Sequence, residues 1–92
     1  MFLKDIEEFK ITVEKSIDSF FGFTPQQMKE NILVIEKLYG QMYDLEKISF
    51  KSIRPDLKEV LMRYRTLKYF NSVYDKTMEL YDFLKKGEKD DC

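Results

Sequence analysis

The chain has 92 residues and a net charge of −1, and its 36% charged and 15% aromatic residues are typical of a small folded domain, not of a disordered segment. It contains no histidine, which excludes the commonest general base, the usual catalytic triads and the histidine-containing zinc motifs. Cys92 is the only cysteine, which excludes an internal disulfide and a cysteine-ligated zinc site. We therefore expect a protein that is not an enzyme and that carries no cofactor.

Three apolar residues at the beginning of the chain are followed directly by charged ones, which is not the pattern of a secretory signal. The longest apolar run, residues 32–35, is far shorter than a membrane-spanning segment. We expect a single domain over residues 1–92, located in the cytoplasm.

The first predicted element is a helix over about residues 2–20. Its apolar residues recur at intervals of three and four, which is the spacing of one face of an amphipathic helix. This face comprises Phe2, Ile6, Phe9, Val13, Ile17 and Phe20.

The stretch FFGFTPQQM that follows is predicted to join two helices. Gly22 suits the left-handed position after a helix end. Thr24 and Gln27 have the spacing of a capping box, and Phe23 and Met28 have that of the hydrophobic staple that accompanies it. Because each of these residues has a structural role, we favour a joint over the alternative of an aromatic pocket for a ligand.

The second predicted helix runs from Pro25 to about residue 47. Gly40 lies inside it, where glycine costs about 1 kcal/mol relative to alanine, so we expect the backbone of another helix to approach closely there. The apolar face of this helix comprises Met28, Ile32, Ile35, Leu38, Tyr39, Met42 and Leu45.

A third helix is predicted to begin at Pro55, after a loop over about residues 48–54. No proline or glycine follows before Gly87, which predicts a helix over about residues 55–86 and a flexible tail over residues 88–92. Such a helix is ~48 Å long, which is longer than either of the first two. The expected fold class is all-α, a three-helix chain whose long third helix belongs to an antiparallel helical bundle.

Apolar residues on the third helix alternate steps of three and four, as in the seam of a coiled coil, with Asn71 as the one polar member. A buried asparagine in such a seam commonly sets the register or the number of partners. The alternative is a break near Asn71, which would fold the helix back and give a four-helix monomer. We favour the continuous helix, because long periodic patterns without caps are typical of coiled coils. The seam comprises Leu57, Val60, Tyr64, Leu67, Asn71, Tyr74, Met78 and Tyr81.

A second apolar stripe lies nearly opposite this seam, and beyond residue 68 the helix is apolar almost all round. The first two helices can cover one seam, whereas a helix that is apolar on all sides must be buried on more than one of them. We therefore expect a homodimer or another protein partner, and a function as a non-catalytic protein–protein interaction module such as an adaptor, an inhibitor or a scaffold subunit. The expected interface comprises Met62, Tyr69, Asn71, Val73, Leu80 and Leu84.

Basic residues align within residues 51–68 and offer an alternative function, the binding of nucleic acid. A competing interpretation is that these residues complement the acidic first half of the chain within the fold, and the weak net charge favours this interpretation. The basic stripe comprises Lys51, Arg54, Lys58, Arg65 and Lys68.

A further alternative is a coat protein for an apolar or lipid surface. In that case the bundle would open and lay its amphipathic faces on the surface, without a membrane-spanning segment.

Overall fold

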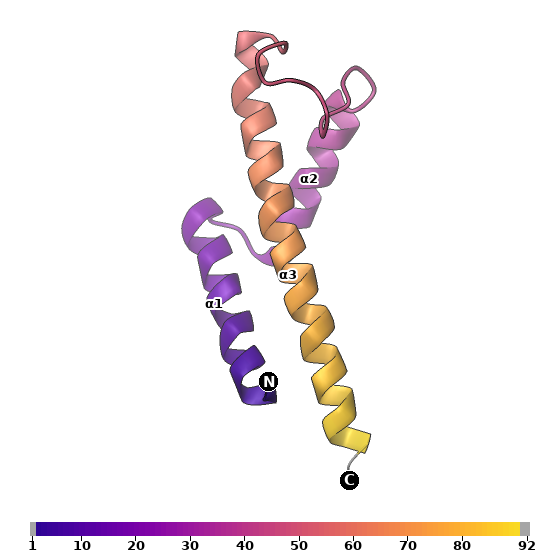
Figure 1. Cartoon of the computed structure of the whole chain (residues 1–92). Coiled ribbons are helices and arrows are strands. Elements are labelled where there is room, and N and C mark those ends of the chain that lie inside the picture. Colours follow the sequence, from indigo (N-terminus) through magenta and orange to yellow (C-terminus); the bar gives the residue numbers. More distant parts are fainter. Residues whose placement is uncertain (1, 91–92) are drawn as a thin grey trace.

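The computed structural model describes residues 2–90, and its regular elements are helices (Figure 1). Helix α1 spans Leu3–Phe21, α2 spans Pro25–Tyr39, and α3 spans Lys58–Asp90, preceded by a short 3-10 helix at Pro55–Leu57. No strand occurs among the described residues. The prediction of an all-helical chain with three helices, the last of them long, is confirmed.

The joint between α1 and α2 has the caps that the sequence predicts. Gly22 takes a left-handed conformation (φ 73°), and its backbone N–H donates into the last turn of α1 (2.7 Å). Thr24 Oγ1 accepts from the Gln27 N–H (3.2 Å), and Gln27 Oε1 accepts from the Thr24 N–H (2.9 Å), which completes the capping box. The adjoining Phe21 ring lies 5.4 Å from the ring of Phe70 on α3. The joint is therefore capped at both helices and packed on the third.

Helix α2 stops short of its predicted end at about residue 47, which corrects the sequence prediction. Gly40 ends the helix instead of lying inside it, and its N–H donates to the Glu36 carbonyl oxygen (2.8 Å). A Cβ at Gly40 would collide with that same oxygen, so the close contact is with α2 itself and not with another helix. Beyond Gly40 the chain leaves the helix and places Leu45 and Ile53 in the core. Their burial offsets the helical hydrogen bonds that are lost.

Helix α3 is continuous. It passes through Asn71 without a break, so the alternative of a fold-back there is wrong. It also passes through Gly87, and residues 88–90 continue the helix where the sequence predicts a flexible tail. A glycine inside a helix costs only about 1 kcal/mol, which does not end a helix of this length. Residues 91–92, including Cys92, lie outside the described part of the chain.

Helices α1 and α2 pack along α3 one after the other and hardly touch each other (Figure 1). Lys10 Nζ of α1 lies 5.7 Å from the ring centroid of Tyr81, and the Phe20 ring, near the other end of α1, lies 5.5 Å from that of Phe70, earlier in α3. Helix α1 therefore runs in the opposite direction to α3. Helix α2 lies along the N-terminal half, and the molecule is elongated, with extents of 56 × 24 × 20 Å.

The core forms where the two shorter helices meet α3. Ile17 of α1, Met28 of α2 and Leu67 of α3 are fully buried in it, so all three helices contribute. The core comprises Val13, Ile17, Met28, Ile32, Ile35, Leu45, Ile53, Leu61, Tyr64 and Leu67.

We expect Leu67→Ala to lower the free energy of unfolding by about 2–5 kcal/mol, because it leaves a cavity in this shared core. Leu33→Ala is the matched control, since Leu33 is 64% exposed on α2, and should change the free energy of unfolding by less than about 0.5 kcal/mol. Urea unfolding followed by circular dichroism measures both. Equal effects of the two substitutions would contradict the assignment of the core.

Candidate functional site

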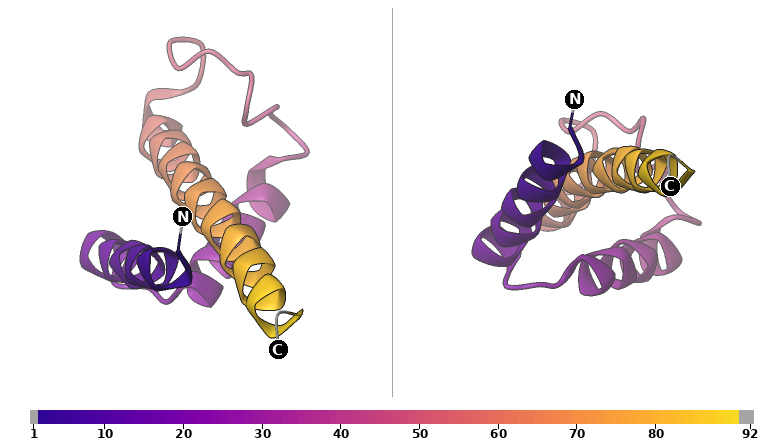
Figure 2. Two further views of the ribbon diagram at one scale, coloured as in Figure 1. Left: turned by 60° about the horizontal axis from the view of Figure 1, so that its bottom comes forward. Right: turned by 90° about the horizontal axis from the view of Figure 1, so that it is seen from below.

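Helices α1 and α2 cover different sides of α3 (Figure 2). In the N-terminal half of α3, the side that carries Leu61, Tyr64 and Leu67 is buried toward α2 and the loop after it. From about the middle of α3 onward, α1 covers the side that carries Phe70 and Tyr81. From the sequence, we expect the first two helices to cover one seam of the third. The structure differs, and apolar stripes on two sides of α3 are partly covered within a single chain.

A third side of α3 is covered by neither helix and carries exposed apolar side chains. Met62 and Tyr69 are 58% and 67% exposed there, and the helical spacing of 100° per residue places Leu80 on the same side. Phe20 flanks this side from the edge of α1, and Phe50 flanks it from the loop. We call this surface the open face. It comprises Phe9, Phe20, Phe50, Met62, Tyr69 and Leu80.

Three open grooves follow the open face. One lies between α1 and α3, has an almost wholly apolar lining and includes Phe9 and Leu80. The next lies beside Phe20 and Phe70, whose rings are 5.5 Å apart. The third lies beside Tyr69, whose ring is 5.8 Å from that of Phe70. These ring contacts join the second and third grooves into one apolar surface.

The structure brings the predicted interface residues together only in part. Met62 and Tyr69 are exposed, whereas Val73, Leu80 and Leu84 are half-buried. Val73 packs against the core, and Leu80 lines the groove between α1 and α3. The stripe predicted from the sequence is therefore fully open only in its N-terminal part.

Asn71, the remaining predicted interface residue, lies on a different side of α3. It follows Tyr64 by two helical turns, which places it on the side toward α2. Its Nδ2 donates to Asp75 Oδ2 (3.4 Å), and Asp75 pairs with Lys29 of α2 (2.6 Å). Its Oδ1 is buried and has no hydrogen-bond partner among the described residues. Asn71 thus belongs to the contact between α2 and α3 and not to the open face.

Three members of the open face are not among the interface residues predicted from the sequence. Phe9 and Phe20 have the spacing of core residues but lie at the edge of the buried side of α1, and both are exposed. Phe50 lies in a segment that the sequence predicts as loop. One signal could have identified the first two, because the apolar face of α1 is wider than the single contact with α3 can cover.

Arg65, a member of the predicted basic stripe, fastens the loop to α3. Its guanidinium donates to the carbonyl oxygens of Leu45 (3.4 Å), Glu46 (3.5 Å) and Ile48 (2.6 Å). A planar guanidinium suits this task, because it offers several donors in a fixed geometry. Arg65 therefore satisfies loop carbonyls that helical hydrogen bonds do not reach.

Other members of the basic stripe also have partners within the chain. Lys68 Nζ lies 3.6 Å from a carboxylate oxygen of Glu46, and Arg54 pairs with Asp56 at 2.9 Å. Lys58 Nζ lies 5.4 Å from the ring centroid of Phe50, and Lys51 is exposed. These contacts favour the interpretation that the basic residues stabilise the fold, since side chains with partners in the same chain are less free to contact phosphates.

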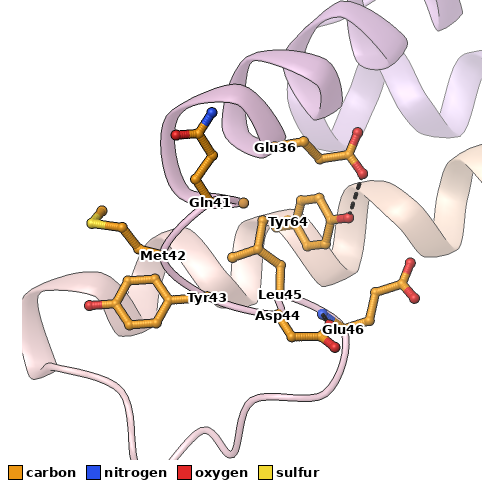
Figure 3. A pocket seen from close by; sticks show the side chains of 9 residues that line it. Glu36, Gln41, Met42, Tyr43, Asp44, Leu45, Glu46 and Tyr64 are labelled. Carbon is orange, nitrogen blue, oxygen red and sulfur yellow. Dashed lines mark hydrogen bonds between the residues drawn. The ribbon is translucent and has the colours of Figure 1, made fainter.

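A pocket at the end of α2 gathers acidic side chains around a buried tyrosine (Figure 3). Tyr64 Oη donates to Glu36 Oε2 (2.8 Å), which joins α3 to α2. Burial raises the pKa of Tyr64, and the hydrogen bond to Glu36 and the charges of Glu46 and Asp44 raise this pKa further. The pocket is lined by Glu36, Gly40, Gln41, Met42, Tyr43, Asp44, Leu45, Glu46 and Tyr64.

The buried tyrosine of this pocket makes a structural contact within the chain. Among the side chains of residues 2–87, no three His, Cys, Asp or Glu gather into a group that could hold a metal ion. The Tyr64 phenol stays protonated and donates to a carboxylate, so it is not an activated nucleophile. We therefore assign the pair of Tyr64 and Glu36 the role of fastening the end of α2 to α3.

Comparisons of the chain with protein-family models, with curated proteins and with solved structures found no match. None of the helices in the described part of the chain has an apolar stretch long enough to cross a lipid bilayer. The open face is therefore the feature from which we infer a function.

The raised pKa of Tyr64 predicts a loss of stability at alkaline pH. Above a pH of about 10 the phenol ionises in the unfolded chain but stays protonated in the folded one, so the free energy of unfolding falls as the pH rises. We expect this fall to be shallower in Tyr64→Phe, because the substitution removes the phenol that ionises. Urea unfolding at a series of pH values measures the slopes. The same slope in Tyr64→Phe and in the unsubstituted chain would contradict the assigned role.

Proposed function

We propose that the chain is a non-catalytic protein–protein interaction module that acts through the open face, and that it associates with a second copy of itself to complete a helical bundle. One observation carries the proposal, namely that exposed aromatic and methionine side chains gather on the one side of α3 that α1 and α2 leave uncovered. Small monomeric proteins rarely expose large connected apolar patches, and such patches mark association sites.

The chemistry of the open face supports this proposal. Aromatic residues and methionine are enriched in protein interfaces, and the exposed Phe9, Phe20, Phe50, Met62 and Tyr69 are all of these types. Tyr69 adds a polar hydroxyl to a large apolar ring, which suits a surface that is exposed in one state and buried in another. An adaptor, an inhibitor or a scaffold subunit would use such a surface.

We expect the chain to sediment as a dimer and to dissociate on dilution over about a hundredfold range of concentration. Met62→Asp/Tyr69→Asp should be monomeric throughout, because it places charges in the apolar contact. Both positions are exposed, so the variant should keep its helical circular dichroism. Sedimentation equilibrium measures the mass, and Leu33→Asp/Leu38→Asp, at exposed leucines on the outer side of α2, is the matched control that should remain dimeric.

Two outcomes would overturn this proposal. One is a folded monomer at every concentration of the unsubstituted chain. The other is association that the control variant abolishes and Met62→Asp/Tyr69→Asp does not, since that result would move the interface to α2. Co-sedimentation with liposomes by a chain that stays monomeric in solution would favour the alternative of a lipid-surface coat.

A further inference from the structure

A second row of residues on α3 has the spacing of a coiled-coil seam and follows the open face. Its steps alternate four and three over the length of the helix, as a row must do if another helix is to lie along it. Met62, Tyr69 and Phe83 of this row are exposed, so it is distinct from the seam that faces α2. The row comprises Met62, Thr66, Tyr69, Val73, Lys76, Leu80, Phe83 and Gly87.

We infer that the occupant of this row is the α3 helix of a second copy, running antiparallel, with a twofold axis between Val73 and Lys76. This inference rests on the proposed function and specifies the orientation and register of the dimer. Val73 of each chain then faces Lys76 of the other. In the same register Tyr69 faces Leu80, Thr66 faces Phe83, and Met62 faces Gly87 of the second copy.

The charge of Lys76 selects the antiparallel orientation. In a parallel pair in register, Lys76 would face the second copy's Lys76 in the middle of the row, and like charges placed together in an interface oppose association. In the antiparallel register each Lys76 lies against Val73 instead. Its aliphatic stem can cover the valine while its ammonium group stays in water at the rim.

Side-chain size agrees with the proposed register. Gly87 lies inside α3. A positive φ would require a glycine there, but among the described residues only Gly22 has a positive φ. A Cβ at Gly87 would have nothing within 4 Å, so no contact within the described chain explains the glycine either. The proposed register places the long side chain of Met62 opposite this gap, and it places the large Phe83 ring opposite the small Thr66.

The same axis also pairs the exposed phenylalanines of α1. Phe9 lies at the level of Thr77 and Leu80 on α3, and Phe20 lies at the level of Phe70. A twofold axis between Val73 and Lys76 exchanges these two levels, so Phe9 of one copy faces Phe20 of the other. One register therefore accounts for the exposed apolar residues of two helices.

The apolar area is of the size that a stable pair needs. At ~200 Å² for each fully exposed large side chain, the exposed fractions of six residues present on the order of 700 Å², compared with ~800 Å² per partner in a standard interface. These six residues are Phe9, Phe20, Phe50, Met62, Tyr69 and Phe83.

Disulfide cross-linking between two differently substituted chains tests the register. Both chains carry Cys92→Ser, one carries Val73→Cys, and the other carries Lys76→Cys. A disulfide requires Cα atoms within about 7 Å of each other, so it forms only where the two positions face each other. We expect mild oxidation of the mixture to give the mixed dimer, and oxidation of either chain alone to give little dimer. A pair of chains with Cys92→Ser and Leu33→Cys, on the outer side of α2, is the control that should not cross-link.

The outcomes separate the register from the proposed function. Strong cross-linking of Val73→Cys chains with themselves, without the mixed product, would overturn the antiparallel orientation but leave a dimer. A dimer by sedimentation in which neither combination cross-links would overturn the register alone. A monomer by sedimentation at the concentrations used would overturn the proposed function and this inference together.

Discussion

The length and continuity of α3 determine how the rest of the molecule is arranged. Neither α1 nor α2 is long enough to cover α3, so they dock on it one after the other, and they do so on different sides (Figures 1 and 2). The contact of α1 with α3 and that of α2 with α3 each bury apolar surface, and each is favourable without the other. The result is a helix that is buried on one side near its beginning, on another side near its end, and uncovered on a third.

Polar contacts hold the end of α2 and the loop after it against α3. Helix α2 ends early, and the loop after it would leave carbonyl groups without helical partners. Arg65 satisfies three of these carbonyls, and the hydrogen bond between Tyr64 and Glu36 holds the end of α2 on α3. Members of the basic stripe thereby contact groups of the same chain, whereas Met62 and Tyr69 of the open face stay exposed.

Local features of the fold could be predicted from the sequence because their causes are local. Gly22 and the capping box of Thr24 and Gln27 act within a few residues, and apolar periodicity without proline is enough to predict one long α3. The early end of α2 could not be predicted in this way, because Leu45 continues the helical spacing but reaches the core from a loop. The composition of the open face could not be predicted either, since it depends on which side of α3 each helix takes.

The concentration dependence of the melting temperature tests the central claim most directly, namely that α3 needs a second copy to cover its third side. Association stabilises the folded chain by mass action, so a hundredfold increase in protein concentration should raise the melting temperature by about 5–10 °C. Thermal unfolding followed by circular dichroism gives this value without any substitution. A melting temperature that stays constant over the whole range would contradict the account and make the chain a self-sufficient monomer.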